Sequence, residues 1–218
     1  MKTALDKVTE GRQYRSVAQM EPVQSDDGSE YIVEGYASTF GTPYTLYDDG
    51  ETRIDEQVDA RAFDETDMSD VIMQYDHTGR VFARESNGTL EITPDEHGLH
   101  VRADLGGTEL GRQVWHEIRD GYTSKMSFGF TIADDRTDRS KTEDGKNLYT
   151  RTITRVGKLY DVSAVSLPAN DATEISARGY VGGVIDAVRA ERLEEERRAE
   201  QRARIAALLH EEEKNGNY

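Results

Sequence analysis

The sequence predicts a mainly β protein with one internal helix and a long polar helix near its C-terminal end. Short apolar runs separated by turn-forming residues recur at intervals of about ten residues along 31–105. Helical spacing of apolar residues marks one internal stretch, 108–121. Because strands outnumber helices, we expect an antiparallel β-barrel or a highly curved sheet with a packed helix. This pattern divides the 218 residues into a flexible N-terminal lead (1–29), a β-rich domain (30–178) and a charged helical tail (179–218).

Composition restricts the classes of function. Asp and Glu outnumber Lys and Arg by 43 to 27, and the net charge of −16 argues against nucleic acid as the main ligand, because phosphate binding needs clustered Lys and Arg. No run approaches ~18 apolar residues, so no membrane span is expected, and residues 1–6 lack the apolar core of a signal peptide. The chain has no cysteine, which excludes a disulfide, a thiolate nucleophile and a cysteine zinc site. An intracellular or particle-enclosed protein fits this composition, and covalent chemistry would depend on Ser, Thr or Lys.

The N-terminal half contains a series of strand candidates. They occupy 31–40, 71–75, 80–84, 89–93 and 99–105. Before them, the polar lead that ends at 24–29 is expected to be flexible or to form an edge strand with a turn. The loop 41–56 is rich in Asp, Gly and Thr, but Asp48, Asp49 and Glu51 lack the ligand spacing of a calcium loop. We therefore interpret it as a solvated acidic loop.

The internal helix has recognisable ends and a core-facing stripe. Thr108 is the expected N-cap, Glu109 suits the first turn, and Gly121 is expected to end the helix. Leu110, Val114, Trp115 and Ile118 recur at helical spacing and therefore form an apolar stripe on one face of the helix. We interpret the stripe as core rather than as a cofactor site.

The C-terminal half is expected to hold the last strands and then the tail. A charged hairpin loop (134–147) precedes strand candidates at 148–154 and 158–167, which end at 168–170. From Val181 the chain becomes a polar helix. Its apolar positions are Val181, Val184, Ile185 and Val188, then Ile205, Leu208 and Leu209 after the charged run 194–198. Such a helix is stabilised by Glu–Arg pairs or docks on a partner, and a solvated tail is the alternative.

A short strand after the internal helix carries a candidate nucleophile. Alternation along a strand places Ser127 and Gly129 on the face opposite Met126, Phe128 and Phe130. A small hydroxyl residue that is followed by glycine leaves a backbone that another chain can approach closely. Most strand serines are simply solvent-facing, so this stretch by itself is weak evidence for a nucleophile.

Four of the five histidines show no metal-site spacing. A catalytic metal needs two or three converging His or carboxylate ligands with supporting contacts. We therefore expect neither a metal nor another cofactor. The four residues are His97, His100, His116 and His210.

His77 differs because it directly follows an apolar strand and precedes a Thr-Gly turn. Such a position presents a side chain at the rim of a sheet. Asp76 is a poor orienter for His77, because adjacent strand residues point to opposite faces. Asp161 is the best candidate for orienting a histidine base, since a lone carboxylate in an otherwise apolar strand needs a reason. A surface-facing position is the alternative interpretation of Asp161.

Six segments, taken in order, resemble the prohead proteases of tailed phages, which are capsid maturation serine peptidases similar in fold to herpesvirus assemblin. The resemblance covers roughly residues 30 to 175, and the last segment is the most distinctive. The segments are 34–40, 62–63, 76–77, 117–121, 126–130 and 161–170.

The resemblance implies roles for three residues. His77 would be the general base, Ser127 the nucleophile and Asp161 the acidic residue that orients His77. The family often has glutamate at this third position, whereas this sequence has aspartate. Ser124 is the rival nucleophile, although it lacks a following glycine. Backbone N–H groups must stabilise the oxyanion, and Gly129 is a first candidate for one of them.

By resemblance, the fold is an assemblin-like antiparallel β-barrel with flanking helices. The implied function is a serine endopeptidase that acts inside the procapsid, in the host cell cytoplasm, on the scaffold region of the major capsid protein. Self-cleavage and a homo-oligomer are left open. Neither nucleic acid nor a membrane is an expected partner. Two other functions remain: a non-catalytic assembly factor that binds capsid or scaffold through the C-terminal helix, and a metal-dependent hydrolase.

Overall fold

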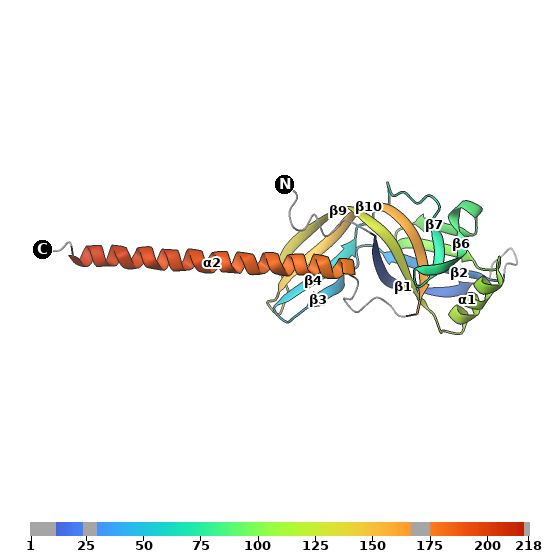
Figure 1. Cartoon of the computed structure of the whole chain (residues 1–218), viewed down its shortest axis with the longest axis horizontal. Helices are drawn as coiled ribbons and strands as arrows, with labels where there is room; N and C mark the ends of the chain where they lie inside the picture. The colour runs from blue at the N-terminus through green and yellow to red at the C-terminus, as the bar shows by residue number, and fades with distance from the viewer. Residues whose placement is uncertain (1–11, 24–29, 167–174, 216–218) are drawn as a thin grey trace.

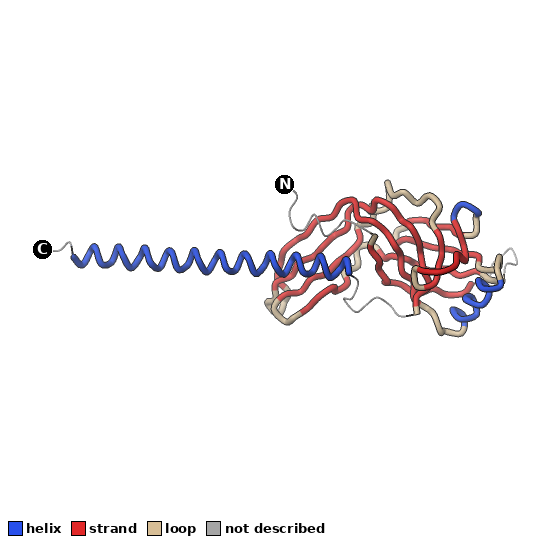
Figure 2. Tube along the Cα trace, in the orientation of Figure 1, coloured by secondary structure: helices blue, strands red, loops and turns tan. Residues whose placement is uncertain are grey.

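The structure of the chain is a computed structural model that describes residues 12–23, 30–166 and 175–215. Figures 1 and 2 show a body made mostly of strands, from which one long helix projects. The elements, in chain order, are Gln13–Val23 (β1), Ile32–Thr39 (β2), Tyr44–Asp48 (β3), Thr52–Val58 (β4), Ile72–Tyr75 (β5), Thr78–Arg84 (β6), the short 3₁₀ helix Glu85–Asn87 (η1), Leu90–Pro94 (β7), Gly98–Asp104 (β8), Glu109–Arg119 (α1), Lys125–Lys141 (β9), Asn147–Val165 (β10) and Ile175–Asn215 (α2).

The strands form one sheet in the order β3-β4-β10-β9-β1-β2-β8-β7. The long strand β10 pairs with β9 antiparallel on one side. On its other side it pairs in parallel with β4 and then with β5, which in turn pairs with β6. Over the described residues the protein is therefore mainly β with two α-helices, but the sheet does not close. The expected antiparallel barrel is wrong, because local patterns predict strands but not the order and direction in which distant strands pair.

The main core lies against the central strands. Met126, Phe128 and Phe130 of β9 are fully buried, as their alternation predicts, and the Phe128 and Phe130 rings stack with centroids 4.5 Å apart. Burying one such side chain stabilises the fold by about 1.5–3 kcal/mol. The opposite face of β9 is thereby left for Ser127 and Gly129.

Helix α1 begins and ends as its sequence predicts. The Thr108 side chain accepts a hydrogen bond from the Gly111 N–H at 2.9 Å, and Gly121 has the positive φ of 79° that follows many helix ends. Val114 and Ile118 are buried in the core. Leu110 is the exception in the predicted stripe, since it is 36% exposed.

Among the described side chains, helix α2 contacts the sheet from Tyr180 to Arg192, with ion pairs Arg139–Glu191 and Arg192–Glu51 at the far end of this contact. Tyr180, Val181 and Val184 are buried in a second apolar cluster. The strand residues of that cluster are Leu46, Ile54 and Tyr149. Figure 1 shows the remainder of the helix extending beyond the sheet, where Leu193 and Ile205 are exposed and Arg198 pairs with Glu194. The predicted long helix is confirmed, while the side chains of 206–215 lie outside the described part.

A buried ionic cluster lies beneath this end of α2. The Glu56 carboxylate accepts hydrogen bonds from Arg15 Nε at 2.5 Å, Arg151 Nη1 at 3.1 Å and the Tyr44 hydroxyl at 2.5 Å. The Arg151 guanidinium also lies 4.1 Å from the centroid of the Tyr180 ring. The cluster therefore joins β1, β3, β4, β10 and α2.

Three expected loop regions differ in the structure. The flexible or edge lead is wrong for Gln13–Val23, which forms β1 between β9 and β2. The loop 41–56 contains β3 and most of β4, with an acidic turn between them. The loop 134–147 is mostly the paired ends of β9 and β10, around a turn at 142–146. The segments 1–11, 24–29 and 167–170 lie outside the described residues.

Candidate active site

The register of three central strands places small and polar residues on one face of the sheet. Ser127 is paired with Ser163 of β10, and Gly129 with Asp161. On the other side of β9, Gly129 is paired with Tyr14 of β1. Residues directly opposite each other in an antiparallel pair share a face. These side chains therefore lie together on the face opposite Met126, Phe128 and Phe130.

His77 reaches this face from a two-residue turn between β5 and β6. Asp76 and His77 have φ values of 47° and 56°, and Tyr75 is paired with Thr78. Two central residues with positive φ define the tight turn that best matches the twist of a hairpin. The turn is tied to the end of β10, because the Asp76 carboxylate accepts hydrogen bonds from the Ser166 N–H at 3.0 Å and its hydroxyl at 2.9 Å.

The three residues singled out from the sequence meet in one hydrogen-bonded chain. His77 Nε2 lies 2.6 Å from Ser127 Oγ, and His77 Nδ1 lies 2.5 Å from Asp161 Oδ1. An ionised carboxylate only accepts hydrogen bonds, so Nδ1–H donates to Asp161 and Nε2 accepts from the Ser127 hydroxyl. Ser127 and Asp161 are buried, and the His77 side chain is 15% exposed.

Asp161 is surrounded by groups that favour its ionised form. Its Oδ1 accepts a second hydrogen bond, from Ser163 Oγ at 3.0 Å. Its Oδ2 forms an ion pair with Arg12 Nη2. A buried carboxylate is tolerated when it is paired and hydrogen-bonded in this way. Asp76, by contrast, contacts Ser166 rather than the imidazole, as predicted, but the two residues lie in a turn and not on opposite faces of a strand.

The environment of His77 favours the neutral imidazole. Burial and, to a smaller extent, the positive charge of Arg12 lower the pKa of His77 to about 4, while Asp76 acts in the opposite direction. The Tyr14 ring packs on the imidazole with centroids 4.2 Å apart. At neutral pH, His77 therefore has a free Nε2 lone pair that faces a serine hydroxyl.

The family model described as caudovirus prohead serine protease matches residues 18–182. The chain belongs to this family. No curated protein and no solved structure matches the chain significantly. The matched range contains Ser127, His77 and Asp161, whereas Arg12 precedes it.

Among the residues that the structure describes, the other candidates from the sequence are not assembled into a second site. The Ser124 hydroxyl has no histidine partner among the described residues, and its backbone carbonyl accepts from the Met20 N–H. His97 and His100 pack against the Tyr36 ring, and His116 packs against Tyr31 and Trp115. The side chain of His210 lies outside the described part.

Gly129, the candidate oxyanion donor, is a paired residue within the sheet, and its role as a donor stays a prediction. Across the part of the chain that the structure describes, no three His or acidic side chains are grouped closely enough to hold a metal ion. Neither helix, as far as it is described, is long and apolar enough to cross a membrane.

Sequence reasoning missed three residues of the site: Arg12, Tyr14 and Ser163. Ser163 was detectable, because it follows Asp161 by two residues and therefore shares its face. Arg12 and Tyr14 lie in the segment that was interpreted as a lead. Their place depends on the pairing of β1 with β9, a contact between residues more than a hundred positions apart.

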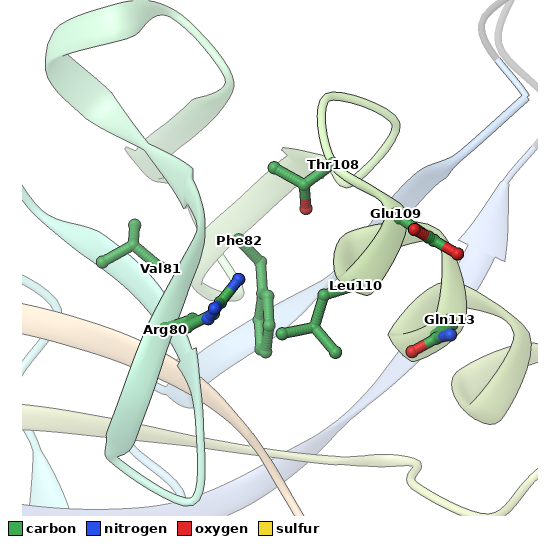
Figure 3. A pocket seen from close by; sticks show the side chains of 7 residues that line it. All are labelled: Arg80, Val81, Phe82, Thr108, Glu109, Leu110 and Gln113. Atoms are coloured by element: carbon green, nitrogen blue, oxygen red, sulfur yellow. The ribbon is translucent and has the colours of Figure 1, made fainter.

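A separate pocket of about 650 Å³ opens between β6 and α1. Figure 3 shows Phe82 and Leu110 facing each other across it, with Arg80 and Glu109 at its edges. None of the three residues of the hydrogen-bonded chain lines this pocket. Its lining begins at Arg80, three residues after His77, on the strand that leads away from the β5–β6 hairpin.

Proposed function

We propose that this prohead protease is a serine endopeptidase with Ser127 as nucleophile, His77 as general base and Asp161 as the residue that orients the base. The observation that carries the proposal is the continuous hydrogen-bonded chain from Ser127 Oγ through both nitrogens of His77 to Asp161. A serine hydroxyl becomes an effective nucleophile when a positioned base accepts its proton and a third group holds that base.

The chemistry proceeds in two stages. Ser127 Oγ attacks the scissile carbonyl while His77 Nε2 accepts the hydroxyl proton and then donates it to the leaving amine. Asp161 stabilises the imidazolium that forms in between. Water, activated by His77, then hydrolyses the acyl-enzyme. Because Ser127 is only 1% exposed, the side chains that cover it must move to admit a substrate carbonyl.

The family indicates where this activity is used. A prohead protease acts together with phage capsid proteins during procapsid maturation in the host cell. The substrate that we propose is the scaffold region of the major capsid protein, cleaved inside the procapsid. Self-cleavage and a homo-oligomeric enzyme are further expectations, each open to a mass measurement on the purified protein.

The test is co-expression with the cognate capsid protein, followed by intact mass analysis. Ser127→Ala is expected to abolish cleavage, because removal of a triad serine costs on the order of a million-fold in turnover. Ser124→Ala is the matched control, since it removes a neighbouring hydroxyl that lacks a histidine partner, and it should cleave like the wild type. Equal cleavage by wild type and Ser127→Ala would place the nucleophile elsewhere.

One observation favours the second candidate, a non-catalytic assembly factor. Beyond its docked turns, α2 presents a long polar face with isolated apolar residues such as Leu193 and Ile205, each 58% exposed. A helix of this kind can bind a scaffold without any cleavage. Particles that mature normally with Ser127→Ala would support this function and contradict the peptidase.

A further inference from the structure

Arg12 reaches the site across Gly129. It directly precedes β1, in which Tyr14 is paired with Gly129, and the next partner across the sheet is Asp161. Residues 12 and 14 alternate onto the same face. From there the guanidinium pairs with Asp161 Oδ2, while Oδ1 of the same carboxylate faces His77. Arg12 and His77 therefore hold the two oxygens of one carboxylate.

The site is shaped to hold this guanidinium. The Arg12 side chain lies over the Tyr160 ring at 4.8 Å and the Tyr14 ring at 5.3 Å, both within range of cation–π attraction. The missing side chain at Gly129 provides the space, because a Cβ there would lie 2.5 Å from Asp161 Oδ2 and 2.8 Å from Arg12 Nε. An ordinary surface ion pair is not enclosed in this way by two aromatic rings and by the space above a glycine.

Asp161 depends on this contact. The carboxylate is fully buried, and Arg12 is the only side chain of the described residues that reaches Oδ2, which has no other partner. Without Arg12, a buried negative charge would be left half paired. Such a carboxylate turns toward another donor, and this change weakens its hold on His77.

We propose that Arg12 is a positioning residue of this active site, which neutralises Asp161 and fixes its carboxylate so that Oδ1 faces His77. This inference rests on the proposed peptidase function. It adds a fourth residue, from outside the range that the family model matches, to the hydrogen-bonded chain.

The proposal gives a direction for the pH dependence. Arg12 lowers the pKa of His77, so its removal raises that pKa. Only the neutral imidazole accepts the Ser127 proton, and activity is therefore lost as pH falls through this pKa. In an Arg12→Met variant the acid limb of the pH profile moves to higher pH, by about one unit. An arginine whose charge did not reach the Asp161–His77 pair would leave the limb in place.

The experiment uses a fluorophosphonate probe, which needs no knowledge of the peptide substrate. In this reaction the Ser127 Oγ–P bond forms as the P–F bond breaks, fluoride leaves, and the hydroxyl proton passes to His77. Arg12→Met should be labelled about 10- to 100-fold more slowly, which is less than the ~10⁴-fold loss typical of disabling the third triad member. Arg12→Lys should recover part of the rate. Arg61→Met, at an exposed arginine, is the control and should be labelled like the wild type.

Two further measurements make the outcome decisive. In an Asp161→Asn background, Arg12→Met should change the labelling rate little, because Arg12 acts through Asp161. An NMR titration of His77 reports its pKa without any catalysis. The proposal would be overturned if Arg12→Met slowed labelling equally in the wild-type and Asp161→Asn backgrounds. It would also be overturned if the pKa of His77 were unchanged in Arg12→Met. Absence of Ser127 labelling in the wild type would instead contradict the peptidase function, while the titration would still test Arg12.

Discussion

At the scale of single residues, Gly129 shows how closely the site constrains the sequence. It lies between Tyr14 and Asp161 in the sheet, and the Asp161 carboxylate and the Arg12 guanidinium occupy the space above its Cα. A glycine inside a strand usually weakens it, because glycine has no side chain to pack. Here the absence of a side chain is what allows two charged groups to meet over β9.

Gly129→Ala tests this requirement. The added methyl group would have to displace Asp161, and a shift of about 1 Å at such a group costs on the order of a hundred-fold in rate. Fluorophosphonate labelling should slow accordingly, while far-ultraviolet circular dichroism stays that of the wild type. Gly107→Ala, where a new Cβ has no neighbour within 4 Å, is the control. If Gly129→Ala were labelled at the wild-type rate, the site would not require the absence of a side chain at position 129.

The three residues of the hydrogen-bonded chain were predicted from the sequence, but the patterns of single residues account for only part of that prediction. Strand alternation separated Ser127 from the core, and the isolated charge of Asp161 marked it within an apolar strand. The link between them came from the family resemblance, because no local pattern shows that residues 77, 127 and 161 meet. Arg12 was missed for the same reason, since its partner lies 149 positions further along the chain.

At the scale of elements, the β5–β6 hairpin is the device that aims His77. Asp76 and His77 both have positive φ, a conformation that costs most residues roughly 1–2 kcal/mol. The turn persists because Asp76 is bonded at both ends: its N–H donates to the Ala164 carbonyl, and its carboxylate accepts from Ser166. The end of β10 thereby fixes the turn that carries the imidazole.

Asp76→Ala should loosen this hairpin. It removes both bonds to Ser166 and places a residue poorly suited to positive φ in the turn, so we expect about 1–2 kcal/mol less stability and slower labelling of Ser127. Asp76→Asn keeps one acceptor oxygen and tolerates positive φ, and should lie near the wild type. Urea unfolding and probe labelling measure the two effects. Labelling of Asp76→Ala at the wild-type rate would show that His77 is held by other contacts.

Some elements were predicted well and others were not, for identifiable reasons. Helix α1 has a cap, an apolar stripe and a terminal glycine, all of which are local signals. Strand β4 was hidden because its acidic entry, where Asp49 accepts from the Thr52 N–H, resembles a loop. Its strand partners are β3 and, in parallel, the distant β10. A strand that lacks a clear local pattern, such as β4, can be recognised only when the strand with which it pairs is known.

At the scale of the whole molecule, the buried ionic cluster connects the two ends of the chain. Glu56 holds Arg15 of β1 and Arg151 of β10, and Arg151 supports the Tyr180 ring of α2. Burial raises the pKa of Glu56, but the two arginines and Tyr44 offset this and hold it at about 2. The glutamate therefore stays ionised inside the protein at any moderate pH.

This cluster predicts acid sensitivity. A pKa near 2 in the folded state, against about 4.3 when unfolded, contributes stability that is fully present above about pH 4.5 and is lost as pH falls toward 2, about 3 kcal/mol in all. Glu56→Gln should lose about 3–5 kcal/mol at pH 7 and flatten the acid dependence, because two buried arginines lose their partner. Urea unfolding from pH 7 to 3 measures both effects.

The exposed Glu143→Gln makes the same change in charge and is the control. It should keep the wild-type slope between pH 4.5 and 3. A Glu56→Gln protein that loses stability with acid as steeply as the wild type would mean that other carboxylates dominate the response.

The position of β1 has a consequence for protein synthesis. Gln13–Val23 leaves the ribosome before the other described strands, yet its neighbour β9 begins at Lys125, and the carboxylate that Arg12 holds comes later still, at residue 161. Until then the first strand lacks a partner on that side, and His77 has nothing to orient it. A nascent chain therefore cannot form the hydrogen-bonded chain of Ser127, His77 and Asp161, so the peptidase that we propose stays inactive until residue 161 has been made.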